Sequence, residues 1–342
     1  MRNLFDKSVF FEKCRNTLPG IVLTGLVVLV SFLLEDAFGI SNVLLALMIG
    51  MLLNPLLTSK RFGKKLEAGV SFCGNIPLQI GTILLGLKIT KELLANLSPA
   101  VCILLVSGVA ATILFSLAIN RWFGWTKGEA ALTGTSVAIC GASAVMALIL
   151  VMGKDTFRRQ TMIAVLISVM CLSSVAMVAY PLMLDFIGMN GVQSGFVLGG
   201  SIHNTSQVVG SCAAMGEDAL AVGTMTKMIR VALLIPVMMV FISCFGEKDN
   251  GRRVNPLTHI PVFLIGFVIL SVINVMGYVP AAVKPPLSLV STVGILLAVA
   301  SIGLKTNMRL LRNVGWSPVL MLTADSLFLF IWMVLGVHLL VP

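Results

Sequence analysis

The chain has 342 residues, of which 58% are hydrophobic and only 11% are charged, and its mean hydropathy is +1.02. A water-soluble fold cannot bury so many apolar side chains behind so few charged ones, whereas a bilayer solvates apolar side chains directly. The composition therefore excludes soluble enzymes and nucleic-acid-binding proteins, and it predicts an all-α polytopic membrane protein. The net charge of +10 does not indicate an acidic partner, because membrane proteins use surplus Lys and Arg to orient their loops.

The N-terminus and the cysteines give the next constraints. Residues 1–17 are too charged, and too long before the first apolar run, to be a cleavable signal peptide. We therefore expect a short cytoplasmic N-terminal segment, and a single transmembrane domain over residues 1–342 with no soluble domain. The 7 cysteines are scattered without a CxxC pair or metal-ligand spacing, so no metal and no cofactor are expected.

Eleven apolar stretches are long enough to cross about 30 Å of hydrocarbon. They cover residues 18–34, 40–57, 72–90, 98–119, 129–151, 160–184, 192–214, 219–244, 258–277, 286–304 and 317–341. Residues 129–151 and 192–214 differ from the other nine, because their centres are dense in Gly, Ser, Thr, Asn and Gln. Such centres are costly in an unbroken helix that faces lipid. We predict nine to eleven transmembrane segments, with these two as interrupted or re-entrant elements.

Positive charge favours the re-entrant alternative. If residues 129–151 and 192–214 are hairpins, more of the Lys and Arg fall on one side than if all eleven stretches cross. Only the hairpin arrangement puts Lys154, Arg158 and Arg159 on that positive side. This predicts nine crossings with a cytoplasmic N-terminus. The first hairpin would enter from the cytoplasm and the second from outside.

A short motif that occurs twice indicates an inverted repeat. The copies are Gly86-Leu87-Lys88, Leu93-Leu94, Asn96, Ser98-Pro99 and Gly303-Leu304-Lys305, Leu310-Leu311, Asn313, Ser317-Pro318. In the predicted topology the helix before the first copy runs outward and the helix before the second runs inward. The two copies would then be related by an axis in the membrane plane.

Two cations lie deep in the eighth stretch. Lys227 and Arg230 are about 12 and 16 Å from its start at roughly 1.5 Å per residue, and they share one helix face. Cations at that depth usually face the bundle interior and mark a functional path. Asp325 is a candidate for a structural ion pair with them, but one acid cannot neutralise two bases. We therefore expect a net positive cavity that binds an anion, and we expect Lys227→Met and Arg230→Met to lose binding while still folding.

The two hairpins offer further donors for an anion. Their Gly-rich turns can start half-helices, whose N-termini present free N–H groups and a partial positive charge. The candidate substrate-binding side chains are Thr135, Ser136 and Ser143 in the first hairpin and Ser201, Asn204 and Gln207 in the second. The alternative for these small residues is tight helix packing.

His203 is at the predicted turn of the second hairpin. Its ordinary pKa near 6.5 makes it a candidate for anion binding and for proton coupling. The alternative is a structural histidine that holds the turn. In either case we expect both turns to meet beside Lys227.

The motifs also resemble a known family. The stretches GTSVAICGASAVMA and GGSIHNTSQVVG, followed by Lys227-Met228-Ile229-Arg230, resemble the YeiH family of bacterial inner-membrane proteins over essentially the whole length. That family is described as sulfate exporters and is grouped with sodium/proton antiporters and bile-acid symporters. The resemblance implies inverted repeats, broken elements that meet at mid-membrane, and transport of a small anion such as sulfate or another sulfur oxyanion. The acidic pair of sodium/proton antiporters has no counterpart in the two hairpins.

The sequence favours a gradient-driven transporter over an enzyme, and it leaves two alternatives. An anion channel could also be lined by basic residues. An intramembrane hydrolase could use Ser143 as nucleophile and His203 as base, although Ala144 replaces the second glycine of the rhomboid motif. No ATP-binding motif is present. The expected partners are a small anion and the bilayer, without nucleic acid, and a homo-oligomer remains open.

Overall fold

The computed structural model describes residues 7–38, 42–59, 62–91, 98–152, 157–245, 261–306 and 315–341, which are helical and contain no strand. The α-helices are α1 Lys7–Phe38, α2 Asn42–Leu52, α3 Asn54–Thr58, α4 Gly63–Leu84, α6 Pro99–Ile119, α7 Lys127–Ala138, α8 Ala142–Met152, α9 Arg159–Ile187, α10 Gly191–Ser201, α11 Thr205–Ala214, α12 Glu217–Ala232, α13 Leu234–Phe245, α14 Val262–Val275, α15 Lys284–Lys305 and α17 Trp316–Leu340. The 3-10 helices are η1 Leu85–Lys88, η2 Asn120–Phe123 and η5 Ala281–Val283.

The predicted fold class, an all-α polytopic membrane protein, is confirmed. Among the described residues, 7 helices are long and apolar enough to cross a membrane. There are also two shorter apolar stretches, Asn42–Thr58 and Val262–Val275. Together with the 7 long helices they correspond to the nine apolar stretches of the sequence other than residues 129–151 and 192–214.

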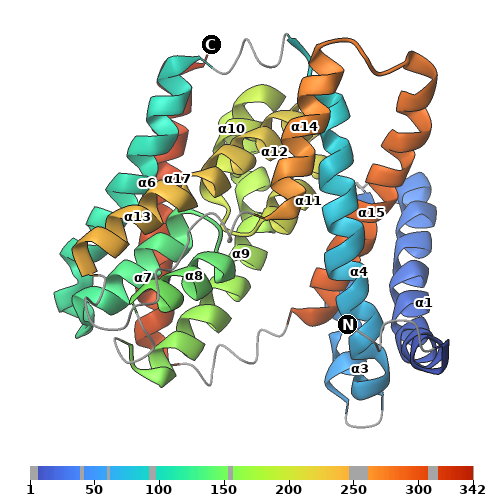
Figure 1. Ribbon diagram of the computed structural model, residues 1–342, viewed down its shortest axis with the longest axis horizontal. Coiled ribbons are helices and arrows are strands. Elements are labelled where there is room, and N and C mark those ends of the chain that lie inside the picture. Colours follow the sequence, from blue (N-terminus) through green and yellow to red (C-terminus); the bar gives the residue numbers. More distant parts are fainter. Residues whose placement is uncertain are drawn as a thin grey trace. The chain divides into compact units, whose positions relative to one another are not determined.

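The helices form two compact units rather than one (Figure 1). The first unit comprises Met1–Leu85 and Val279–Asn307, and the second comprises Gly86–Tyr278 and Met308–Pro342. Each unit therefore combines an early and a late part of the chain, so a division along the sequence could not reveal them.

The first unit is built around α4 and α15, which pack antiparallel. The Ser291 hydroxyl of α15 donates to the Gly81 carbonyl near the end of α4, at 2.8 Å. At the other end of the pair, Ser301 donates to the Val70 carbonyl at 2.6 Å. Because small residues let membrane helices approach closely, serine and glycine at this interface hold the two backbones together.

The predicted repeat agrees with the helix directions. The first copy begins at the end of α4 and the second at the end of α15, and these helices run in opposite directions. In the second unit, α6 and α17, which follow the two copies, are also antiparallel. Phe115 stacks on Phe328 at 4.3 Å between ring centroids, and the Trp125 indole donates to Ser317 at 2.8 Å. Outside the described residues lie Leu93, Leu94, Asn96, Leu310, Leu311 and Asn313.

The first polar stretch folds as a helical hairpin, which we call hairpin 1: α7, a tip at residues 139–141, and α8. Arg158, which follows α8, returns to the start of α7 and makes a double ion pair with Glu129, at 2.7 and 2.8 Å. Since residues 129 and 158 lie together, the stretch enters and leaves unit 2 at the same end.

The second polar stretch forms hairpin 2: α10, a tip at residues 202–204, and α11. Helix α10 runs parallel to α12, because Gly191 lies beside Asp218 and Gly199 beside Gly223. Helix α11 runs the other way, with Cys212 against Gly223 and its end only two residues before α12. Both ends of hairpin 2 therefore lie at the start of α12.

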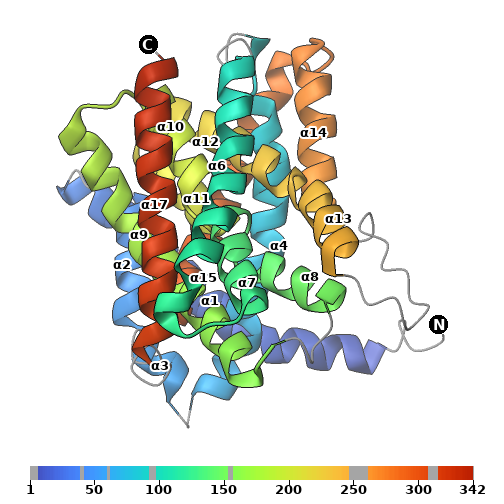
Figure 2. The ribbon, with the colours of Figure 1, turned by 90° about the vertical axis from the view of Figure 1, so that its left-hand side faces the viewer.

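The two hairpins enter from opposite ends of the second unit (Figure 2). Helix α9 connects their bases: it begins beside the Glu129–Arg158 pair and ends just before α10. Its 29 residues span about 43 Å at roughly 1.5 Å per residue. The interrupted elements predicted from the sequence are confirmed as hairpins, and an arrangement in which all eleven stretches cross does not fit.

Candidate functional site

The hairpin tips meet at Lys227 of α12. Its ammonium group donates three hydrogen bonds to backbone carbonyls: to Ile139 in the tip of hairpin 1 at 2.6 Å, and to Ile202 and His203 in the tip of hairpin 2 at 2.9 and 2.5 Å. Lys227 itself is fully buried. The prediction that the two polar stretches meet beside Lys227 is therefore confirmed.

Arg230, one turn further along α12, joins the same two tips. Its Nε donates to the Ala138 carbonyl at 2.9 Å, and its Nη2 donates to Val137 and Ala138 at 2.8 and 2.6 Å. Its Nη1 reaches hairpin 2, at the carbonyls of Gly199 and Ile202, at 3.1 and 3.2 Å. Five N–H donors are thus all used, as are the three of Lys227.

These bonds correct one expectation from the sequence. We expected Lys227 and Arg230 to present free donors to an anion, whereas every donor of both residues is bound to a carbonyl. The physical reason is that α7 and α10 end in the interior of the unit, where their last carbonyls have no intrahelical partner. A cation near a helix C-terminus also stabilises the helix dipole. In this state the cations hold the two hairpin tips together.

The positive charge at this junction has no ion-paired acid among the residues that the structure describes. The ion pairs found there are Lys88–Glu217 and Arg158–Glu129, so Asp325 does not pair with Lys227 or Arg230. Asp325 is fully buried and lies instead beside the hydroxyls of Ser116 and Thr133. The ion pair considered from the sequence is therefore not formed.

Two half-helix N-termini begin at the same junction. Helix α8 starts directly after Gly141 and α11 directly after Asn204, whose side chain caps it by accepting from the Ser206 N–H at 3.4 Å. A Cβ atom on Gly141 would lie 3.7 Å from the Cβ of His203, so the two tips touch. The first-turn N–H groups of both helices carry partial positive charge and are suited to an anion.

The predicted substrate-binding hydroxyls divide into two groups. Ser136 and Ser201 are buried and bond to carbonyls of their own helices, at 2.7 and 2.6 Å. Thr135 is also buried, and its hydroxyl has no partner within the described ranges. Ser143, in contrast, is exposed at the start of α8, where it bonds to the Cys140 carbonyl at 3.1 Å. Ser143 is therefore the hydroxyl that is open to a ligand.

Two adjacent serines of α9 accept hydrogen bonds from hairpin 2. The backbone N–H of Asn204 donates to Ser173 at 3.2 Å, and the Gln207 amide donates to Ser174 at 2.8 Å. Gln207 is fully buried, whereas Asn204 is half-buried. The sequence did not single out this serine pair, although two adjacent serines in an apolar stretch are a signal that could have found it.

His203 holds the tip of hairpin 2 against α17. Its Nε2 lies 2.9 Å from the Ser326 hydroxyl, and the ring is fully buried. The other ring nitrogen, Nδ1, has no hydrogen bond within the described part of the chain. His203 and Ser143 do not form a dyad here, because Ser143 bonds to Cys140 and His203 to Ser326.

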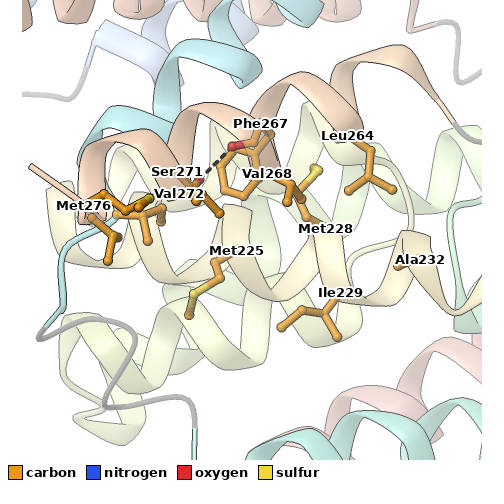
Figure 3. Close-up of a pocket in the computed structure, with 12 residues that line it drawn as sticks. Met225, Met228, Ile229, Ala232, Leu264, Phe267, Val268, Ser271, Val272 and Met276 are labelled. Atoms are coloured by element: carbon orange, nitrogen blue, oxygen red, sulfur yellow. Dashed lines mark hydrogen bonds between the residues drawn. The ribbon is translucent and has the colours of Figure 1, made fainter. Parts of the chain in front are cut away.

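An apolar cavity of about 410 Å³ lies on the other side of α12, between α12 and α14 (Figure 3). Met225, Met228 and Ile229 line it from α12, and Leu264 and Phe267 line it from α14. At 3.6 residues per turn, these α12 residues face away from Lys227 and Arg230. The cavity therefore offers apolar surface only and is separate from the hairpin junction.

Comparison with known proteins agrees with this membrane architecture. Residues 19–322 match the family described as "Conserved hypothetical protein 698". The chain belongs to this family. The "UPF0324 membrane protein TauZ" of Paracoccus denitrificans is 38% identical to it over 326 residues, which cover 94% of this chain and 95% of that protein. The "UPF0324 membrane protein CT0845" of Chlorobaculum tepidum is 34% identical over 319 residues, covering 93% and 88%. The chain is therefore a membrane protein related to these bacterial proteins, and the family resemblance seen in the sequence is confirmed.

Proposed function

We propose that this protein is a secondary transporter that moves a small anion across the bacterial inner membrane by alternating access. One observation carries the proposal: two hairpins from opposite ends of unit 2 meet at two buried cations that have no ion-paired acid among the described residues. Broken elements that meet inside the membrane are typical of secondary transporters. The uncompensated positive charge selects an anion as the substrate.

The proposed anion site is at the N-termini of α8 and α11 rather than on the cation side chains. The N–H groups of these half-helices, the Ser143 hydroxyl and the Asn204 amide are the donors there. Lys227 and Arg230 supply long-range positive charge and fix the tips. Donors that converge from two helices suit an oxyanion with several oxygens, so sulfate and other sulfur oxyanions are the first substrates to test.

Two other functions are less well supported. An anion channel needs a continuous conducting path, whereas the hairpin tips are closed by eight hydrogen bonds from Lys227 and Arg230. A Ser/His hydrolase needs a hydrogen bond between nucleophile and base. Ser143 bonds to Cys140 instead, and the partner of His203, Ser326, is buried.

The proposed orientation places the base of hairpin 1 in the cytoplasm, because Arg121, Lys127 and Arg158 lie at that end. Single cysteines at Lys127 and at Asp218, both exposed and at opposite ends of unit 2, test this orientation. In intact cells, an impermeant maleimide should label position 218 and not position 127. The reverse result would invert the orientation.

Counterflow in proteoliposomes tests the transport itself. Vesicles loaded with unlabelled sulfate, sulfite, thiosulfate or a small sulfonate should accumulate radiolabelled sulfate faster than vesicles without protein. Ser143→Asp would place a fixed carboxylate at the α8 N-terminus and should abolish this exchange. The neutral, equally sized Ser143→Asn should retain it. Exchange that Ser143→Asp leaves unchanged would refute the site, and large unitary currents in place of exchange would identify a channel.

A further inference from the structure

Asp325 is an unusual group for the interior of a membrane protein. It lies about 14 Å along α17 at roughly 1.5 Å per residue, and its side chain is completely buried. Neither carboxyl oxygen has a hydrogen-bond partner that meets normal geometry among the described residues. An ionised carboxylate without partners is very costly in such a place, whereas a neutral carboxyl is much less so.

In this structure the hydroxyls beside Asp325 donate their hydrogens to a backbone carbonyl, so towards Asp325 they can act as hydrogen-bond acceptors. Ser116 of α6 and Thr133 of α7 both reach the Ala130 carbonyl, at 2.8 and 2.9 Å, and lie 2.9 Å from each other. Each hydroxyl has one hydrogen, and these contacts use both. Their remaining lone pairs can accept from Asp325 only if the carboxyl carries its proton.

No described charge neutralises Asp325 from the helices that pack on α17. Helix α7 brings Glu129, which is paired with Arg158. Helix α9 brings the Tyr180 hydroxyl, which donates to the Ser326 carbonyl at 3.4 Å, and the hairpin 2 tip brings His203 against the Ser326 side chain. Helices α6 and α10 contain no charged residue. The donors of Lys227 and Arg230 all go to carbonyls.

From this geometry we propose that Asp325 is the proton-binding site that couples anion movement to a proton gradient. The inference rests on the proposed transport function and assigns its coupling ion. When Asp325 is neutral, its O–H donates to a hydroxyl of the Ser116–Thr133 pair. When the proton leaves to water, those hydroxyls turn from the Ala130 carbonyl to the carboxylate, which loosens α7 in hairpin 1.

The position of Asp325 connects this step to both hairpins. Thr133 belongs to α7, whose last carbonyls bind Arg230. The next residue of α17, Ser326, contacts His203 in the hairpin 2 tip. Loss or gain of one proton at Asp325 therefore changes the contacts of α17 with hairpin 1. Asp325 also lies one residue from Ser326, which makes the contact of α17 with hairpin 2.

Infrared difference spectroscopy on the purified protein in lipid tests the proton site without any substrate. Between about pH 5 and 9, a range that brackets titration of a buried carboxyl, the parent should lose the C=O stretching band of a protonated carboxyl as the pH rises. Asp325→Asn should lack this band, and Glu129→Gln, which changes another buried carboxyl, should keep it. An identical band in the parent and in Asp325→Asn would overturn the proposal.

A second variant keeps the test informative if Asp325→Asn does not fold. Replacing Ser116 with Ala and Thr133 with Val removes the hydroxyls that could stabilise the carboxylate. The midpoint of band loss should then move to higher pH by about one unit, because the carboxylate loses two donors whereas the neutral carboxyl loses only one acceptor. An unchanged midpoint would show that these hydroxyls do not face the titrating group.

Proton-driven uptake tests the coupling. With sulfate as the probe, a pH gradient across the vesicle membrane should raise uptake of labelled sulfate by the parent. In Asp325→Asn the ratio of gradient-driven uptake to counterflow exchange should fall several-fold. An unchanged ratio would overturn the coupling role. If the parent does not move sulfate at all, the proposed substrate fails, and the infrared titration still decides whether Asp325 binds a proton.

Discussion

The two hairpins end at the same two cations, yet different forces hold them in place. In hairpin 2, residues 194–201 of α10 are buried, and glycines bring α10 onto α12. In hairpin 1, α8 leaves Ser143 and Met146 exposed, with Met146 at 53%. Helix α7 of this hairpin is as buried as α10, and Gly134 packs it against α6, so the difference lies in α8, which follows a left-handed glycine at the tip and leads to the charged pair at the base. Close packing leaves little freedom, so hairpin 2 is the fixed element and α8 is the part that can move.

The largest effect should come from the cations that the hairpins share. Lys227→Met and Arg230→Met should each cost about 3–5 kcal/mol of unfolding free energy, because buried carbonyls of both tips lose charged partners. This replaces the expectation from sequence that both variants fold normally. The measurement is thermal unfolding in detergent. Lys88→Met is the matched control, since its partner Glu217 is 86% exposed and the loss should stay below about 1 kcal/mol.

Arg230→Lys separates charge from geometry. It keeps the positive charge but has three donors in place of five, so its stability should lie between those of the parent and Arg230→Met. If Lys227→Met and Arg230→Met are both as stable as the parent, the cations do not hold the tips together, and the common anchor of the two hairpins is refuted.

The next effect distinguishes the two kinds of glycine. A Cβ on Gly199 of hairpin 2 would lie 2.4 Å from the Gly223 carbonyl oxygen, so Gly199→Ala should cost about 1–3 kcal/mol through overpacking. A Cβ on Gly141 in hairpin 1 would make only ordinary van der Waals contacts, the nearest at 3.7 Å, but this residue has a φ of 64°. Gly141→Ala should cost about 1–2 kcal/mol through backbone strain alone.

Asparagine substitutions sharpen this distinction. Asn tolerates the left-handed conformation better than Ala does, so Gly141→Asn should be less destabilising than Gly141→Ala. At position 199 the larger side chain should make Asn worse than Ala. Melting temperatures of the four variants give the order. The same order at both positions would mean that packing limits both hairpins.

Part of this arrangement could be predicted from the sequence and part could not. Apolar length gave the nine ordinary helices, and the polar, glycine-rich centres gave the hairpins, because both follow from local composition. The contacts of Lys227 and Arg230 could not be predicted, since their partners are backbone carbonyls, which every residue possesses. The neighbours of Asp325 could not be predicted either, because Ser116 and Thr133 come from distant parts of the chain, and the sequence therefore suggested an ion pair instead.

A smaller effect is expected at the hairpin bases. Burial alone would raise the pKa of the Glu129 carboxyl, but hydrogen bonds from Arg158, Thr126 and Thr161 outweigh burial and lower this pKa to about 2. The lowered pKa means that Glu129 stabilises the fold fully above its unfolded pKa of about 4.3. This contribution is lost as the pH falls from there towards 2.

Glu129→Gln should therefore cost about 1–2 kcal/mol at neutral pH, and much less near pH 3, where the parent has lost part of the same contribution. At the base of hairpin 2, the neutral cap Asn190 accepts from the Gln193 N–H at 2.9 Å. Asn190→Ala should cost about 1 kcal/mol, with no such dependence on pH. A Glu129→Gln loss that is constant with pH would contradict the role of charge in holding hairpin 1.

The smallest effect on stability is expected for cysteine substitutions at the starts of α8 and α11. The accessibility of these cysteines to a reagent compares the two hairpins directly. Ser143 at the start of α8 is exposed, whereas Ser206 in the first turn of α11 is only 4% exposed. Ser143→Cys and Ser206→Cys, each in a variant whose seven native cysteines are replaced, should change the unfolding free energy by less than about 1 kcal/mol. A small maleimide should react at least tenfold faster at position 143, because thiol reactivity requires access to solvent. Sulfate should slow only this reaction if the anion binds at the α8 N-terminus, whereas chloride at equal ionic strength should not. Equal rates at the two positions would mean that α8 is as tightly held as α11, and the contrast between a fixed and a movable hairpin would fail.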